Sequence, residues 1–291
     1  MVDTTTTISD LPMGDVRRAV AAALAEDLPW GDVTSDNLIP IDQQGIGRIE
    51  SRQAGVLAGL PIALETFAQV DPSLRVEVVL QDGAKLGSGD VIAFIRGPLR
   101  SLLQGERVAL NFLQRLSGIA TTTQHYVQAI EGTDARVVDT RKTTPGLRLF
   151  EKYAVRVGGG NNHRYCLSDA VLIKDNHLAA LRLRGLDLES AVRGLRRQIP
   201  HTTSIEVEVE DFEQLRSALS SGADTILLDN MNPAALREAV NLVAGRARTE
   251  ASGGITLHTV RAVAEAGVNL ISVGALTHSV RALDLALEIV M

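Results

Sequence analysis

The sequence has little of several features that define broad protein classes. Among 291 residues there is one cysteine, Cys166, which excludes an intramolecular disulfide and a metal site built from several cysteines. Aromatic residues make up only 3%, so a core must consist mainly of Ala, Val, Leu and Ile. No apolar run approaches the ~20 residues that span a bilayer, and the first residues lack the basic and apolar regions of a signal peptide. We therefore expect a cytoplasmic protein without a membrane partner.

Basic charge is also scarce overall, but it is concentrated in one segment. The net charge is −6, and without a long Lys/Arg run this argues against nucleic-acid binding. Residues 139–177 instead contain seven lysines and arginines against four acids, a local charge of +3. Arg141 and Lys142 follow the apolar run 135–138, and Lys174 follows the run 170–173. Cations at the ends of buried strands predict a site for an anionic ligand.

The first part of the chain is typical of a mixed α/β sandwich domain, which we place at residues 1–118. Short β-branched runs at 47–51, 56–60, 74–80 and 90–95 predict strands, with a helix at 61–70. A helix at 15–28, with Asp15 as its N-cap, precedes an acidic loop. A long helix over 101–130, which Gly118 could interrupt, leads into the second domain.

The second part, residues 119–276, repeats a pattern of strand, polar loop and helix. Such repeats predict a parallel sheet with right-handed crossovers, which we interpret as an incomplete or modified (β/α) barrel, with a doubly wound sheet as the alternative. The segment 277–291 is amphipathic and predicts a helix that packs back on the first domain. The expected strands lie at 135–138, 170–173, 205–209, 225–228, 248–251 and 270–273.

Polar residues and glycines end these expected strands, and in a barrel all of them would meet at one mouth. They are Thr140, Arg141, Lys142, Lys174, Glu206, Glu208, Asp229, Ser252, Gly253, Gly254 and Gly274. The glycine-rich ends could open helices, here 255–266 and one after Gly274, whose amides bind phosphate, or they could only form tight turns. The glycine run 158–160 lacks a following Gly-Lys-Ser/Thr and is no P-loop. It would instead turn His163 and Arg164 inward, unless it is a plain surface loop.

The acids and Lys174 leave several functions open. Glu208 and Asp229 could hold Mg²⁺, directly or through water, and bind sugar hydroxyls, or they could be structural partners of the arginines. A glycosidase with paired carboxylates would leave the cations unexplained. Lys174 could be the Schiff-base nucleophile of an aldolase. A non-enzymatic regulator that binds a phosphosugar is a further alternative.

A series of motifs in the expected order supports one family. In the second domain these are DTRKTTPGLR, GGGNNHRYCLSD, LIKDNH, IEVEVE, ILLDN and ASGGI. EDLPWGDVTS and GERVALNFLQRLSGIAT precede them in the first domain. Over nearly its whole length the chain resembles the quinolinate phosphoribosyltransferase family.

This resemblance implies that quinolinate and phosphoribosyl pyrophosphate react with Mg²⁺ to give nicotinate mononucleotide, pyrophosphate and CO₂. It implies a homodimer with shared active sites, in which Arg107 reaches the neighbouring site. Lys142, Lys174, Glu208 and Asp229 would be catalytic, the two acids serving Mg²⁺ and the ribose hydroxyls. The nearest alternative is a transferase acting on nicotinate itself. The residues expected to bind substrate are Arg107, Thr140, Arg141, Lys142, His163, Arg164, Lys174, Glu208 and Asp229, with Ser252, Gly253, Gly254, Val273, Gly274 and Ala275 around the 5′-phosphate.

Overall fold

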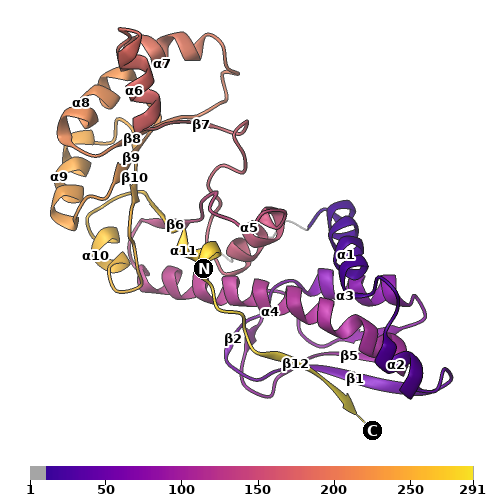
Figure 1. Ribbon diagram of the computed structural model, residues 1–291. Helices are drawn as coiled ribbons and strands as arrows, with labels where there is room; N and C mark the ends of the chain where they lie inside the picture. Colours follow the sequence, from indigo (N-terminus) through magenta and orange to yellow (C-terminus); the bar gives the residue numbers. More distant parts are fainter. Residues whose placement is uncertain (1–10, 291) are drawn as a thin grey trace. The chain divides into compact units, whose positions relative to one another are not determined.

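The computed structural model describes residues 11–290, which form two compact units. Unit 1 comprises residues 11–124, 145–159 and 280–290, and unit 2 comprises residues 125–144 and 160–279. Neither unit is a continuous stretch of chain, because unit 1 takes in a segment that lies between two strands of unit 2. Figure 1 labels the elements of both units.

Unit 1 contains a four-stranded antiparallel sheet in the order β12-β1-β5-β3 and a separate pair, β2-β4. Most of the long helix α4 also belongs to unit 1. The strands are β1 (Gln44–Ser51), β2 (Gly55–Val56), β3 (Arg75–Val78), β4 (Lys85–Leu86), β5 (Val91–Pro98) and β12 (Leu285–Val290). The helices are α1 (Met13–Asp27), α2 (Val33–Leu38), α3 (Leu60–Val70), α4 (Leu99–Ala129) and α5 (Arg148–Val157).

Unit 1 contains one large apolar core cluster. Ile49 of β1 and Ile95 of β5 are buried in one cluster with Leu110 and Leu113 of α4. Gly118 does not interrupt α4. A Cβ atom at Gly118 would lie 2.2 Å from the carbonyl oxygen of Arg281, so this glycine lets the segment before β12 pass close to the helix.

Three predictions for unit 1 are wrong at the level of local structure. α1 begins at Met13 after Pro12, so Asp15 lies in the first turn instead of capping the helix. The expected acidic loop contains α2, because the Asp32 carboxylate accepts hydrogen bonds from the amides of Thr34 and Ser35 and so caps a helix.

The third wrong prediction is the C-terminal helix expected over 277–291. Apart from the short α11 at its start, the described part of this segment ends in strand β12, which pairs with β1. Leu283, Leu285 and Leu287 are buried at a spacing of two residues, which is the period of a strand. The apolar residues follow the period of a strand and not that of a helix. The expected packing of this segment on the first domain is observed, because β12 pairs with β1.

Unit 2 contains a six-stranded parallel sheet in the order β6-β11-β10-β9-β8-β7. From β7 to β11 each strand pairs with the next one in sequence, and the last strand lies beside the first, as in a barrel. A doubly wound sheet would reverse its order at a switch point. Between the outer strands, β6 and β7, no ladder forms within residues 11–290, so the predicted incomplete (β/α) barrel is confirmed. The strands are β6 (Arg136–Val138), β7 (Val171–Ile173), β8 (Ile205–Val209), β9 (Thr225–Asp229), β10 (Arg248–Ser252) and β11 (Leu270–Ser272).

The helices of unit 2 cover one face of this sheet. α8 packs against β8 and β9, and α9 against β10, and Figure 1 shows both helices along one side of these strands. Side-chain oxygens of Asp187, Asp211 and Asn232 cap α7, α8 and α9. The helices are α6 (Asp175–Leu183), α7 (Leu188–Arg196), α8 (Phe212–Ser221), α9 (Pro233–Val243), α10 (Val260–Ala264) and α11 (Ala275–His278).

The helix expected at 255–266 is much shorter than predicted. α10 spans only Val260–Ala264, so Gly253 and Gly254 do not open a helix directly. Thr256 and Thr259 instead form a turn through the Thr256 amide and the Thr259 hydroxyl, which delays the first helical residue. Across residues 11–290, the helices do not combine the length and apolar character that a membrane span requires.

Candidate active site

The inner face of the unit 2 sheet is polar. In the register of the sheet, Glu208 of β8 stands opposite Leu227 of β9, and Asp229 opposite Ser252 of β10. Paired residues of parallel strands point to the same side, and every second residue shares a face. Glu206, Glu208, Asp229, Glu250 and Ser252 therefore share one face. The opposite face, which includes the buried Val207, Ile226 and Leu228, packs under the helices, so the predicted acids of β8 and β9 share the face opposite the helices.

Lys174, directly after β7, forms an ion pair with Glu208. Its Nζ lies 2.9 Å from Oε2 of the glutamate. The lysine side chain is 46% exposed, so it is not the buried amine that a Schiff-base nucleophile with a lowered pKa requires. An ammonium held by a carboxylate differs from the neutral amine that attacks a carbonyl, and this weakens the aldolase interpretation.

Arg141 and Arg164 form a pair of neighbouring cations. Burial lowers the pKa of Arg164, and the charge of Arg141 lowers it further, against the opposing charges of Glu206 and Asp169. Nε of Arg141 is buried and has no hydrogen-bond partner within the described chain. Two like charges so close, one with an unsatisfied donor, favour an anion between them.

His163 lies between two buried glutamates. Its Nε2 is 3.1 Å from Oε2 of Glu206 and 3.4 Å from Oε1 of Glu250. Burial alone would lower the pKa of His163, but the hydrogen bonds and charges of the two glutamates raise it to about 10. Burial also raises the pKa of Glu206. At neutral pH the cluster of His163, Glu206 and Glu250 therefore binds one more hydrogen than the same three side chains would bind as separate groups in water.

The other ring nitrogen decides where these hydrogens lie. Nδ1 of His163 accepts the amide hydrogen of Arg164 at 2.7 Å. A hydrogen on Nδ1 would point against that amide, so Nε2 carries the ring hydrogen and the second one lies on a glutamate. The ring is therefore not doubly protonated, because two donors cannot face each other at 2.7 Å.

Asp139, which follows β6 and is fully buried, holds the segment that carries His163 and Arg164. Its Oδ1 accepts the His163 amide hydrogen at 2.8 Å, and its Oδ2 accepts from Nδ2 of Asn162 at 2.6 Å. Asn161 also forms a parallel bridge with Val138 of β6. The glycine run thus leads into an anchored segment and not a plain surface loop.

The loops after β9 and β10 are locked together. Asn230 has a positive φ of 54° and donates its amide hydrogen to the Ser252 carbonyl at 2.9 Å. Gly253 has φ +97°, and a Cβ there would lie 2.2 Å from Oδ1 of Asn230, so a tight turn explains this glycine. At Gly254 a Cβ would meet no atom within 4 Å, which leaves the backbone open to a ligand.

The loop after β11 lies beside Lys142. A Cβ on Gly274 would be 3.1 Å from Cδ of Lys142, and the Thr277 hydroxyl donates to the Lys142 carbonyl at 2.8 Å. The Lys142 amide donates to the Thr140 hydroxyl at 3.0 Å. Val273 is buried and Ala275 begins α11, so the expected phosphate loop adjoins an exposed lysine.

Comparison with known families covers both parts of the chain. The family profile described as "Quinolinate phosphoribosyl transferase, C-terminal domain" matches residues 119–288, and the corresponding N-terminal profile matches residues 32–117. The protein belongs to the quinolinate phosphoribosyltransferase family.

Relatives of known name agree with this family. A probable nicotinate-nucleotide pyrophosphorylase (carboxylating) of Bacillus subtilis is 46% identical over 266 residues, 91% of this chain and 90% of that protein. A mitochondrial quinolinate phosphoribosyltransferase (decarboxylating) of Nicotiana tabacum is 42% identical, over 96% of this chain and 83% of that protein. The crystal structure of NadC from Streptococcus pyogenes matches with a TM-score of 0.91 and 42% identity, covering 97% of this chain and 100% of that one.

The structure places Lys174 beside Glu208, Arg141 beside Arg164, and Lys142 beside the loop after β11. Three important acids, however, received no role from the sequence. Asp139, Glu206 and Glu250 lie under the cations. A signal existed for Glu250, since an acid inside a strand that is otherwise buried is rare. Arg107 is on α4 in unit 1, where its side chain is 58% exposed and its guanidinium is 3.8 Å from Glu106, so its expected role stays a prediction.

Proposed function

We propose that the protein transfers the phosphoribosyl group of phosphoribosyl pyrophosphate to quinolinate with loss of CO₂. The products are nicotinate mononucleotide and pyrophosphate, a step of de novo NAD biosynthesis. The observation that carries this proposal is the pair Arg141 and Arg164, whose charges adjoin and of which Arg141 has a buried unsatisfied donor. Quinolinate is a dianion, and such a pair is suited to it.

The chemistry of the two carboxylates explains the choice of residues. Arginine offers a planar fork that binds a carboxylate through two parallel hydrogen bonds, which lysine cannot do. Arg141 and Arg164 would each face a carboxylate, and Lys174 would add charge at the rim. A substrate with one carboxylate would leave one of these cations without its partner, so the site should discriminate against nicotinate.

The transfer step requires no nucleophile from the protein. The C1–oxygen bond of the ribose breaks, its electrons leave with pyrophosphate, and the pyridine nitrogen supplies the pair for the new bond to C1. The cations of the chain fix the ring so that this nitrogen points at C1, and Lys142 lies where it can meet the leaving group. Catalysis is then chiefly positioning and electrostatics.

Loss of CO₂ follows from the product of the first step. The alkylated nitrogen is cationic, so the adjacent carbon can keep the electron pair of its bond to the carboxylate as CO₂ departs. That carbon then takes up a proton. Arg141 and Arg164 hold the ring in place during this step, and a site that excludes water favours the loss of a carboxylate.

The acids at the strand ends fit Mg²⁺. Glu208 and Asp229 offer hard oxygen donors on one face of neighbouring strands, and Mg²⁺ prefers one or two carboxylates plus phosphate oxygens. When bound, Mg²⁺ would neutralise charge on the pyrophosphate. Glu208 is already oriented by Lys174, and Asp229 accepts a hydrogen bond from Asn230 at 2.7 Å. Both acids could also bind the ribose hydroxyls, and the open backbone at Gly254, with the loop at Gly274, could bind the 5′-phosphate.

We further propose that the enzyme works in the cytoplasm as a homodimer in which Arg107 of one subunit completes the site of the other. The exposed side chain of Arg107 supports this assignment. Arg107→Ala and Lys174→Ala would each be inactive alone. Mixing the two variants, after unfolding and refolding together, would restore part of the activity only if one site draws on both subunits.

The function is tested with purified protein, Mg²⁺ and phosphoribosyl pyrophosphate, with quinolinate or nicotinate in parallel. Nicotinate mononucleotide from quinolinate alone is expected. Product from nicotinate alone would keep the transferase class but overturn the dicarboxylate site. No product from either substrate would overturn the proposal.

A further inference from the structure

The segment 160–164 carries Arg164 and has no regular helix or strand of its own. Its position depends instead on side chains beneath it. Asp139, Glu206 and Glu250, which are 0%, 6% and 1% exposed, reach it from the ends or interiors of β6, β8 and β10. Burying three acids is costly, so a fold retains them where they perform a task.

His163 transmits this arrangement to Arg164. On one side of the ring, Nε2 faces Glu206 and Glu250; on the other, Nδ1 accepts the Arg164 amide hydrogen at 2.7 Å. Both ring nitrogens are therefore engaged within the protein. Whatever direct contact His163 makes with substrate, its nitrogens already connect two buried carboxylates to the backbone of the next residue.

A metal ion is the obvious alternative for this cluster. Ligand atoms of His163, Glu206 and Glu250 lie within 4.8 Å of one another. A metal at Nε2, however, requires a lone pair there and a hydrogen on Nδ1. Because Nδ1 accepts the Arg164 amide, the hydrogen is on Nε2, and the cluster is built for hydrogen bonds and not for a cation.

We propose that Glu206 and Glu250 are positioning residues for the dicarboxylate site. Oε2 of Glu206 accepts the Nε2 hydrogen of His163 at 3.1 Å, and the Glu250 carboxylate lies 3.4 Å from the same nitrogen. Together they fix the ring plane, and through Nδ1 they fix the backbone from which the Arg164 guanidinium extends. This inference rests on the proposed function. It assigns to the two acids an effect on quinolinate and none on phosphoribosyl pyrophosphate.

Two carboxylates beside Nε2 serve this purpose better than one. Without the charge of Glu250 on its second side, the ring could rotate about its bond to Cβ, and the Arg164 amide would then lose its acceptor. Arg164 is held at its other end by the Ala170 carbonyl, to which Nη1 donates at 2.9 Å. With the backbone and the guanidinium both fixed, the cation is oriented before the substrate arrives.

The test compares Glu206→Ala and Glu250→Ala with Glu206→Gln and Glu250→Gln. A glutamine oxygen can still accept the Nε2 hydrogen, whereas alanine removes the acceptor. We expect each alanine variant to raise the KM for quinolinate about tenfold to a hundredfold, the scale of a misplaced contact. The KM for phosphoribosyl pyrophosphate should stay within about twofold, and the glutamine variants should regain most of the loss. Glu238→Gln, an exposed acid on α9, is the control and should match the wild type.

Alanine variants that fold and keep the wild-type KM for quinolinate would overturn the inference, and so would an equal rise in both KM values. If the alanine variants do not fold, ¹⁵N spectra of the histidines in wild type and Glu250→Gln decide. The inference requires one histidine with hydrogen on Nε2 and an accepting Nδ1, and its absence from the wild type overturns it. These spectra need no turnover. A wild type that makes no nicotinate mononucleotide, but shows this histidine, would count against the proposed function alone.

Discussion

The two sheets of this protein bury opposite kinds of side chain. In unit 1, Ile49, Ile92 and Ile95 of the antiparallel sheet are buried against apolar residues of α4. In unit 2, one face of the parallel sheet is equally apolar, with Val207 and Leu228 under the helices, but the other carries Glu206 and Glu250. Both sheets alternate with a period of two residues, but within residues 11–290 only the unit 2 sheet buries carboxylates in its strands.

This difference separates stability from function. Apolar burial stabilises by roughly 25 cal/mol per Å², so the unit 1 core and the outer face of the unit 2 sheet hold the fold. Buried carboxylates do the opposite unless they are paired. The inner face of unit 2 therefore adds little stability and is kept for the site. Substitutions in the unit 1 core should therefore change stability, whereas substitutions on the inner face of unit 2 should change activity.

The largest effect is expected at Arg141, the cation with a buried and unsatisfied Nε. Arg141→Ala should lower kcat/KM for quinolinate by about a hundredfold to a thousandfold, as loss of one charged contact in a preorganised site does. Thermal unfolding should stay near the wild-type temperature, because the side chain has a buried Nε without a partner within residues 11–290. Turnover is followed as nicotinate mononucleotide.

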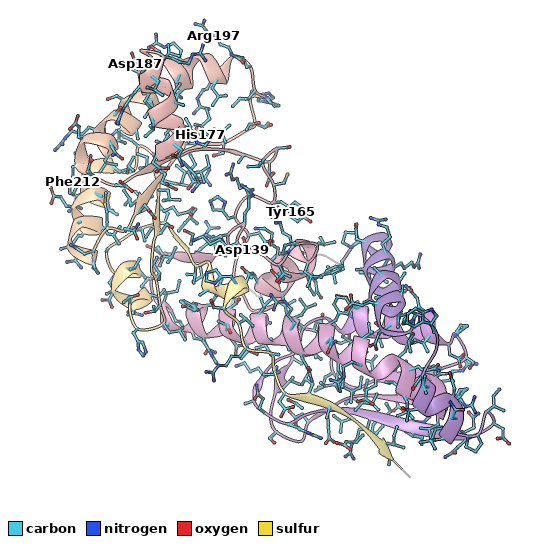
Figure 2. The ribbon with its side chains drawn as sticks, viewed as in Figure 1. Asp139, Tyr165, His177, Asp187, Arg197 and Phe212 are labelled. Carbon is cyan, nitrogen blue, oxygen red and sulfur yellow. The ribbon has the colours of Figure 1, made fainter. Side chains whose placement is uncertain are left out.

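Arg197→Ala is the matched control. Arg197 is an exposed arginine at the end of α7, and Figure 2 shows it on the side of the unit away from Asp139. It should retain full activity. Wild-type turnover in Arg141→Ala, or equal losses in both variants, would remove the basis of the proposed site.

Next in size is a truncation in the unit 1 core. Leu113→Ala should lower the free energy of unfolding by about 2–5 kcal/mol, because a fully buried leucine leaves a cavity. Activity per folded molecule should be unchanged at low temperature. The check is chemical denaturation alongside steady-state kinetics. A loss of activity without a loss of stability would show that the two regions do not divide as proposed.

Much of this organisation could be predicted from the sequence, because parallel strands that are buried on both faces have a strong local signal. The runs at 205–209 and 225–228 became β8 and nearly all of β9. β12 was mistaken for a helix because its leucines fit two periods over a short stretch, and its pairing with β1 is a contact between distant parts of the chain. Glu250 was missed for a related reason. Its partner His163 is 87 positions earlier, and only the fold brings the two together.

A smaller effect is expected at the glycines of the strand ends. Gly253→Ala should cost about 1–3 kcal/mol, because φ is +97° and the new Cβ would meet Asn230. Gly222→Ala has a similar φ of +75° but open space, so it should cost only about 1 kcal/mol. The free energies of unfolding of both variants, measured by denaturation, separate the cost of the positive φ from the cost of the steric contact with Asn230.

The same pair of variants tests the site. Gly253→Ala should also raise the KM for phosphoribosyl pyrophosphate, since the loop after β10 would shift, whereas Gly222→Ala should not. Equal stability and equal kinetics in the two variants would mean that the contact between the loops after β9 and β10 contributes neither to stability nor to binding of phosphoribosyl pyrophosphate.

The last expected effect is a dependence of stability on pH that originates in the inner face of unit 2. Glu206 and Glu250 raise the pKa of His163 to about 10 from its usual 6.5, so the folded protein binds a hydrogen that the unfolded chain releases earlier. The stabilisation is complete below pH 6.5 and is lost as the pH rises through about 10. Wild type should therefore lose free energy of unfolding over this window relative to His163→Gln, measured by denaturation at a series of pH values. The exposed His201→Gln should follow the wild-type curve. Parallel curves for wild type and His163→Gln would mean that the glutamates leave the protonation of this cluster unchanged, and the polar face would then be as inert to pH as the apolar core of unit 1.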